Sequence, residues 1–449
     1  MFIGLILPVI AGYELIVLLF ARYPLPFFVS LALAYGLGMG LLTQWMFLLG
    51  VLGIPYTLGS LPGGVILFIV ILIYPVSKVY KRQRQQTTPA NHQGQNKLDF
   101  ISKCCLVYVC WAVYWIFWRA LNIPVSSWDA ISTIAFKAKI IFYDQSLINI
   151  GNSPHAAYPL HVSFLQAWMA FNMHGWHEQW VNLIFPCAFV SYLIMQFHFL
   201  RTLTNERWAL LGLVLLISSN LLTFHASIGY RDFFLLYYNC TTIILILLFR
   251  ILPHTNALLL LAGLFGGFTS FVKVEGTFYL LIHTIVLLVV LFTQNAFSFK
   301  EKLKKVIFFI IPSYSICGFY HLFRILSGIS IEEKGQFLWP QEIFSKVLIF
   351  FTTVIQNLFL TGNWNLLWVL FFLSLLKRDR IKRLVEVRLL LLALLLSFGF
   401  LSFLALFTAS FIWIAGSQAA TTLPRMTLHF LPLVIMVIVL LNCPLLKEK

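Results

Sequence analysis

Long runs of apolar residues with few interruptions dominate this chain, and they predict helices that cross a membrane. A helix needs about 20 apolar residues to span the hydrocarbon core of a bilayer. The pattern therefore predicts an all-α polytopic membrane protein with about 13 transmembrane helices. The predicted spans lie near residues 2–20, 26–50, 62–80, 101–121, 181–200, 208–227, 233–251, 256–272, 276–294, 306–324, 364–376, 387–411 and 427–444.

The composition excludes a water-soluble protein. Of the 449 residues, 60% are hydrophobic and only 10% are charged, whereas soluble domains carry about 25% charged residues. The 44 phenylalanines suit lipid-facing helices better than the alternating strands of an outer-membrane barrel. The seven cysteines form no CxxC pair or disulfide framework, so they do not indicate a redox compartment.

The charges are strongly unbalanced, with 31 Lys and Arg against 15 Asp and Glu. In a soluble protein such an excess would suggest nucleic acid, but in a membrane protein Lys and Arg mark the cytoplasmic loops. All four basic segments, at 78–84, 300–305, 377–383 and 447–449, can be cytoplasmic together. We therefore expect a plasma (inner) membrane protein, in contact with membrane lipids and with no nucleic-acid partner, whose C-terminus is cytoplasmic.

One polar stretch divides the chain. Residues 85–100 are rich in Gln, Thr and Asn and predict a cytoplasmic linker. It separates an N-terminal extension of three spans, residues 1–84, from a transmembrane core at 101–449. The core carries a predicted external loop at 122–180.

Two apolar segments resist simple counting. Residues 158–173 could form a short span or a helix at the membrane edge. The edge position keeps Arg201 and Arg207 cytoplasmic and places Asp232 outside, so the positive-inside rule favours it. Residues 342–360 must likewise be interfacial or re-entrant if the basic segment at 377–383 is cytoplasmic.

Ionisable residues gather at the external ends of the predicted spans. Such groups are costly at membrane depth, about 2.5–3.5 kcal/mol each at a helix centre, so they usually mark a site. A carboxylate can serve as a general base toward a hydroxyl or amine, while Lys and Arg can hold a phosphate. The candidates are Trp128, Asp129, Lys137, Lys139, Arg231, Asp232, Lys273, Glu275 and Arg425.

Structural roles compete with the catalytic ones. Asp129 directly after Trp128 also fits a helix cap with an interfacial aromatic anchor. The adjacent Arg231 and Asp232 also fit a helix start, where an acidic residue favours the helix dipole. Lys273 and Glu275 stand two positions apart and do not share a helix face, so Lys273 is expected to find a partner elsewhere.

The histidines of the external loop offer only a weak metal pattern. His155, His161, His174 and His177 lack a Cys or a further carboxylate at ligand spacing, so solvated interfacial histidines are favoured over zinc. The sequence requires no cofactor, and it gives no support for a divalent metal.

Five short elements follow one another in a defined order at the external ends of the spans. The second opens a predicted helix, and the third lies about one hundred residues after the first. They are Trp128-Asp129-Ala130 with Phe136-Lys137-Ala138-Lys139, then Tyr158-Pro159-Leu160-His161, Gly229-Tyr230-Arg231-Asp232, Lys273-Val274-Glu275-Gly276, and Arg425 followed by Pro432.

With these elements the sequence, over residues 101–445, resembles the GT-C superfamily of integral-membrane glycosyltransferases. This superfamily includes protein O-mannosyltransferases and lipid A aminoarabinose transferases. The resemblance is greatest to bacterial members related to glycosyltransferase family 39. Two features depart from the family pattern: Ala130 stands where mannosyltransferases often have a second acid, and the three spans before residue 100 precede the usual start.

The resemblance implies an inverting transfer of a sugar from a polyprenyl-phosphate donor to a glycan, lipid or protein of the cell envelope, at the external face. Asp129 would be the general base, and Asp232 would support the base or the acceptor. Lys273 and Arg425, together with Arg231, would bind the donor phosphate. Tyr158 and His161 would belong to a helix outside the membrane or re-entrant into it.

Two other classes of protein compete with this interpretation. A transporter or flippase of a lipid-linked glycan could line a pathway with the same charges, although the chain shows no internal repeat. A structural scaffold of a membrane complex needs none of these charges. Their clustering at one face favours chemistry.

Overall fold

The protein is almost entirely helical. The computed structural model describes residues 2–86, 98–253, 255–294, 296–330, 337 and 343–444, and 79% of it is helix. Its described part has no strand beyond one isolated antiparallel bridge between Phe337 and Thr408. The predicted all-α class is confirmed. Most of the predicted linker, at 87–97, and the basic segment 447–449 lie outside the described residues.

Nine of the 13 predicted spans are helices long and apolar enough to cross a membrane. Their length and composition identify a polytopic membrane protein. In the described part of the chain they are α1 (Phe2–Leu19), α2 (Phe27–Val51), α3 (Leu61–Gln86), α4 (Phe100–Asn122), α7 (Ile184–Leu203) with the 3₁₀ turn η3 (Trp180–Leu183), α10 (Arg231–Ile251), α12 (Gly276–Thr293), α13 (Phe299–Leu326) and α17 (Val385–Phe407).

The other four predicted spans are shorter or broken. The segment 208–227 is interrupted because the side chain of Ser219 caps a new helix. The segment 427–444 begins with a bend of 53° between two helices, where Pro432 lacks a backbone N–H. The helices concerned are α8 (Glu206–Ile217), α9 (Asn220–His225), α11 (Asn256–Val272), α15 (Leu367–Leu375), α19 (Ala419–Leu428) and α20 (Leu431–Asn442).

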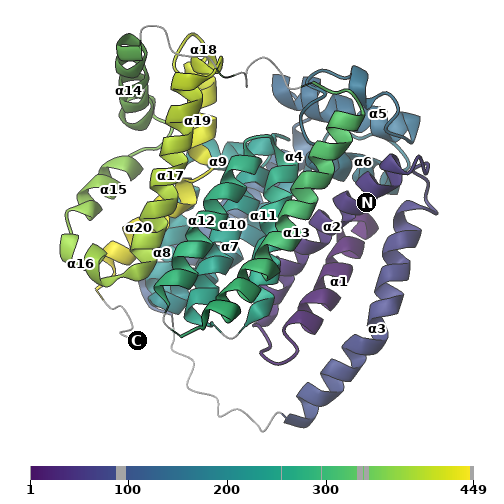
Figure 1. Ribbon diagram of the computed structural model, residues 1–449, viewed down its shortest axis with the longest axis horizontal. Helices are drawn as coiled ribbons and strands as arrows, with labels where there is room; N and C mark the ends of the chain where they lie inside the picture. The colour runs from purple at the N-terminus through teal and green to yellow at the C-terminus, as the bar shows by residue number, and fades with distance from the viewer. Residues whose placement is uncertain are drawn as a thin grey trace.

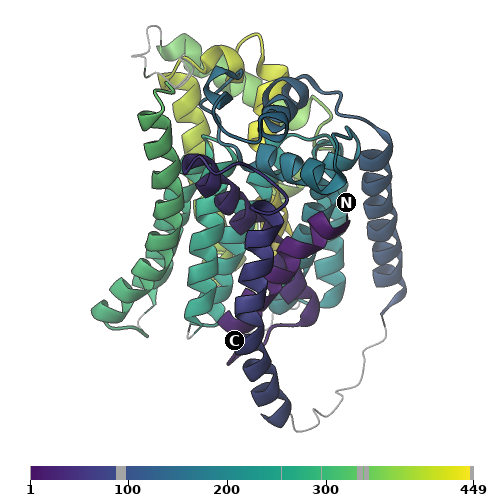
Figure 2. The ribbon, with the colours of Figure 1, turned by 90° about the vertical axis from the view of Figure 1, so that its right-hand side faces the viewer.

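The long helices stand side by side, and short helices cover one end of the bundle (Figure 1). We call the end that carries α5 (Phe136–Asp144), α14 (Ile343–Phe359) and α18 (Phe411–Ile414) the upper end. The basic helix α16 (Arg378–Arg383) lies at the opposite, lower end. Figure 2 shows that the last turns of α3 also lie there.

The ambiguous segment at 158–173 forms α6 (His161–Met173), which lies beside α5. Its 13 residues are too few to cross a bilayer alone. The second ambiguous segment forms α14, which packs beside α19 in the upper part of the molecule (Figure 1). The positions of these two helices relative to a bilayer stay a prediction.

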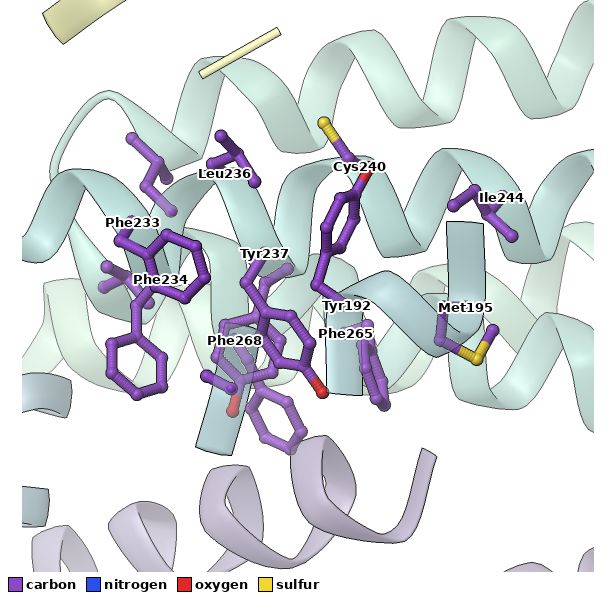
Figure 3. Close-up of a cluster of buried hydrophobic side chains, with 14 of the residues drawn as sticks. Tyr192, Met195, Phe233, Phe234, Leu236, Tyr237, Cys240, Ile244, Phe265 and Phe268 are labelled. Atoms are coloured by element: carbon purple, nitrogen blue, oxygen red, sulfur yellow. The ribbon is translucent and has the colours of Figure 1, made fainter. Parts of the chain in front are cut away.

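The centre of the bundle is α10, whose side chains are almost all buried. Figure 3 shows Tyr237 and Phe234 of α10 among aromatic rings of the neighbouring helices. The hydroxyl of Tyr238 donates to the carbonyl of Gly36 on α2 at 3.0 Å. The N-terminal helices thus pack directly on the core.

Helices α1 and α2 touch through two glycines. A Cβ atom added to Gly38 would lie 1.9 Å from the carbonyl oxygen of Pro8, and one added to Gly12 would lie 2.1 Å from that of Ala34. These contacts are with backbone, which cannot move aside cheaply. In lipid there is no hydrophobic driving force for helices to associate, so close packing of this kind holds α1 and α2 together.

The substitution G38A should therefore destabilise the protein. Its methyl group would push α1 from α2, and overpacking of this kind costs about 1–3 kcal/mol. Thermal unfolding of the purified protein in detergent measures the effect. The matched control is G399A, on α17, where the added Cβ has open space and the better helix propensity of alanine should maintain stability. Equal midpoints for the two variants would contradict the packing argument.

Candidate active site

A cavity of about 190 Å³ opens at the upper end of the bundle. Its walls come from the π-helix η1 (Ala130–Ala135), the start of α10, the connection between α11 and α12, and α17 to α19. Seven of the candidate residues found in the sequence line it. They are Asp129, Tyr158, Arg231, Asp232, Lys273, Glu275 and Arg425.

Asp129 forms an ion pair with Arg425 across the cavity. The Oδ2 atom of Asp129 accepts a hydrogen bond from Nη1 of Arg425, whose guanidinium also lies over the ring of Tyr230, 5.5 Å from its centre. The Asp129 side chain is 41% exposed, and it caps no backbone N–H of η1. Its polar contact is therefore with α19 rather than with its own helix end.

Asp232 is the most enclosed carboxylate of the cavity, with only 4% of its side chain exposed. Its Oδ1 atom accepts from Nζ of Lys273 at 3.0 Å and lies 2.8 Å from Nε2 of His429. Although Asp232 stands in the first turn of α10, its side chain caps no backbone N–H of that helix. It joins three elements instead.

Lys273 finds the outside partner that its spacing from Glu275 predicts, since it contacts Asp232. It also contacts Glu275, with 3.1 Å between Nζ and Oε1. The expectation that these two side chains diverge holds only within a helix, and Lys273 is extended, at φ −154° and ψ 152°. Burial lowers the pKa of Lys273, but the charges of Asp232 and Glu275 outweigh it and raise the pKa above its ordinary value.

Arg231 is held differently from the other two cations. Its Nη2 atom donates to the carbonyl of Thr133 at 2.9 Å and Nη1 lies 3.3 Å from the hydroxyl of Thr133. The guanidinium covers the ring of Tyr158, 5.1 Å from its centre. No carboxylate in the described part of the chain forms an ion pair with it, and its Nε atom is buried without a hydrogen-bond partner there.

Four candidate residues do not line the cavity. Lys137 is fully buried and donates to the carbonyls of His155, at 2.5 Å, and Tyr158, at 3.4 Å. It thereby fixes the loop that carries Tyr158, because a buried ammonium needs acceptors. Lys139 forms a partly exposed ion pair with Glu178 at 2.6 Å.

His161 and Trp128 also stand apart from the cavity. His161 is buried beside the hydroxyl of Thr43, 3.0 Å from Nδ1. Burial disfavours the imidazolium and lowers the pKa of His161 to about 3, so the ring is neutral and serves packing. Trp128 is 79% exposed, so it is a surface aromatic side chain at the upper end of the bundle, of the kind that is common at membrane interfaces.

The sequence reasoning missed His429, whose buried ring contacts Asp232. His429 follows Arg425 by four residues, a spacing that places both on one face of a helix. An examination of the residues one helical turn after Arg425 would have identified His429 from the sequence. Among the described residues, no three His, Cys, Asp or Glu side chains come together in a way that could hold a metal ion.

Comparisons with protein-family models, curated proteins and solved structures found no match to this chain. The geometry of the cavity is thus the basis for any functional argument.

Lys137 and Lys139 give a matched test of the loop anchor. The substitution K137M removes the buried ammonium that donates to the carbonyls of His155 and Tyr158, and loss of these charged hydrogen bonds should cost about 1–3 kcal/mol of stability. The substitution K139M removes a partly exposed ion pair, worth about 0–1 kcal/mol, and a contact of the ammonium with the ring of Trp176, 5.1 Å from its centre. Thermal unfolding of both variants checks this difference. Equal stability would show that Lys137 does not anchor the loop.

Proposed function

We propose that this protein is a glycosyltransferase of the GT-C type. It would transfer a sugar from a polyprenyl-phosphate donor to a cell-envelope acceptor. The observation that carries the proposal is a cavity at one end of an apolar bundle, where an accessible carboxylate, Asp129, lies with the guanidinium groups of Arg425 and Arg231. A lipid-linked phosphate donor would present its charged head at this depth, while its tail stays in the membrane.

Asp129 is the carboxylate best placed to act as a general base. Only its Oδ2 atom is bound by Arg425, and no described residue donates a hydrogen bond to Oδ1. In the reaction, the acceptor's hydroxyl or amine would lose its proton to Asp129 and form a bond to the anomeric carbon. The bond from that carbon to the phosphate oxygen would break on the opposite side, so the configuration inverts and polyprenyl phosphate leaves.

Arg231 and Arg425 are the residues best suited to the donor phosphate. Arg231 forms no ion pair with a carboxylate in the described chain, and guanidinium groups bind phosphate through two parallel hydrogen bonds. Lys273, which the family resemblance assigns to the phosphate, already faces two carboxylates. Its main role in this proposal is to hold Asp232.

The arrangement of the helices supports an external site. The nine helices that are long and apolar enough to cross a membrane run between the upper and lower ends of the bundle (Figures 1 and 2). The basic helix α16, the last turns of α3 and the first turns of α13 share the lower end (Figures 1 and 2). If these nine long helices cross the bilayer, the positive-inside rule makes the lower end cytoplasmic and the cavity external, in the plasma membrane.

A transport function is less well supported. A pathway for a lipid-linked glycan would need polar surface through the bundle, yet the aromatic cluster of Figure 3 fills the space around α10. Asn239 and His283, below the cavity, are buried and bond to each other at 2.8 Å. The polar groups thus favour chemistry at one face.

Replacing the proposed base should abolish transfer. The variant D129N keeps the shape of the side chain but cannot take a proton, so kcat should fall about 10²- to 10⁴-fold. Release of undecaprenyl phosphate from undecaprenyl-phosphate mannose, and from the aminoarabinose analogue, measures turnover in membranes. The control is D144N, at the exposed end of α5. Wild-type turnover in D129N would exclude Asp129 as the base.

The orientation can be tested with single cysteines. Ile148 is 86% exposed beyond α5 at the upper end, and Arg378 begins α16 at the lower end. In intact cells, I148C should react with a membrane-impermeant maleimide, whereas R378C should react only after permeabilisation. Because the chain has its own free cysteines, the wild-type protein sets the background. The reverse labelling pattern would place the cavity in the cytoplasm.

A further inference from the structure

The two carboxylate oxygens of Asp232 differ in their contacts, because only one of them accepts hydrogen bonds from described residues. Both Lys273 and His429 bind Oδ1, at 3.0 and 2.8 Å. No described residue donates a hydrogen bond to Oδ2, and Asp232 lines the cavity. Two donors on one oxygen restrict the orientation of the carboxylate and leave the second oxygen able to accept from a group bound in the cavity.

His429 is itself held from several sides. It lies at the bend between α19 and α20, and its ring is completely buried. The amide nitrogen of Asn239 donates to the main-chain carbonyl of His429 at 2.9 Å. Asn239 in turn bonds to His283. The other ring nitrogen of His429, Nδ1, lies 3.5 Å from the hydroxyl of Tyr279.

We propose that His429 is a positioning residue for the transfer reaction, an inference that rests on the proposed function. With its proton on Nε2, the ring donates to Oδ1 of Asp232 and accepts from Tyr279 through Nδ1. Asp232 then presents Oδ2 to the cavity, where it accepts a hydrogen bond from a hydroxyl or amine group of the substrate. Residues that orient metal-binding side chains in this way typically contribute about 10- to 100-fold in affinity or activity. We expect an effect of similar size here.

The hydrogen bond from Asn239 to the main chain of His429 allows a positioning role of the His429 side chain to be distinguished from a purely structural one. Asn239 binds the carbonyl oxygen of His429, so that contact persists whichever side chain stands at position 429. The bend between α19 and α20, and with it the placement of Arg425, therefore keeps an anchor in any side-chain variant. If turnover is lost while the hydrogen bond from Asn239 remains, the loss is due to the missing contact with Asp232.

Three substitutions at this position provide the first test. A glutamine amide nitrogen can take the place of Nε2, whereas an asparagine nitrogen reaches only as far as Nδ1. H429L and H429N should lower kcat about 10- to 100-fold, as expected for a lost hydrogen bond to a charged group, with little change in KM for undecaprenyl-phosphate mannose. H429Q should stay within a few-fold of wild type. The control is H161L, a buried histidine outside the cavity, which should unfold at a lower temperature but keep kcat.

A double-mutant cycle for thermal unfolding tests the same contact without any substrate. The effects of H429L and D232A should be non-additive, because each removes the same hydrogen bond. Additive effects, or full turnover by folded H429L, would overturn the positioning role. If the cycle is non-additive but the protein transfers no sugar, the proposed function is wrong, and so is the role of Oδ2 in binding substrate. The contact between His429 and Asp232 would then be structural.

Discussion

The upper end of this protein depends on the mutual neutralisation of charges inside an apolar bundle. Three carboxylates, Asp129, Asp232 and Glu275, and three cations, Arg231, Lys273 and Arg425, line one cavity. An isolated charge in such a place is costly, and partners at hydrogen-bond distance offset that cost. Every one of these side chains except Arg231 has an opposite charge in direct contact, which explains why so many ionisable groups are tolerated in one small volume.

Interruptions of the helices bring the charges together. Lys273 and Glu275 flank the break between α11 and α12, Asp232 opens α10, and Arg425 precedes the bend between α19 and α20. At such breaks the backbone turns, and side chains that would point in different directions on a continuous helix converge. The bend between α19 and α20 also makes the predicted span at 427–444 irregular, so one feature that builds the cavity accounts for one of the departures from the predicted spans.

The sequence was sufficient for the helical class, for nine of the long helices and for the six charged residues of the cavity, because apolar length and a charge beside an apolar run are both local signals. It was insufficient where position depends on tertiary contact. Lys137 and Arg231 are both basic residues near the upper end, yet one anchors a loop and the other lines the cavity. His429 carries no charge signal, and its significance follows only from its contact with Asp232.

The pairing of Asp129 with Arg425 links substrate binding to the proposed chemistry. A donor phosphate carries more negative charge than a carboxylate and offers more acceptor oxygens, so it would compete with Asp129 for the guanidinium of Arg425. Arg425 need not leave the cavity, because Tyr230 supports its planar face. A carboxylate that gives up its cation to the donor becomes a free acceptor for a proton beside the anomeric carbon. The base would then be released by the substrate whose reaction it serves, which would limit proton transfer to the occupied site.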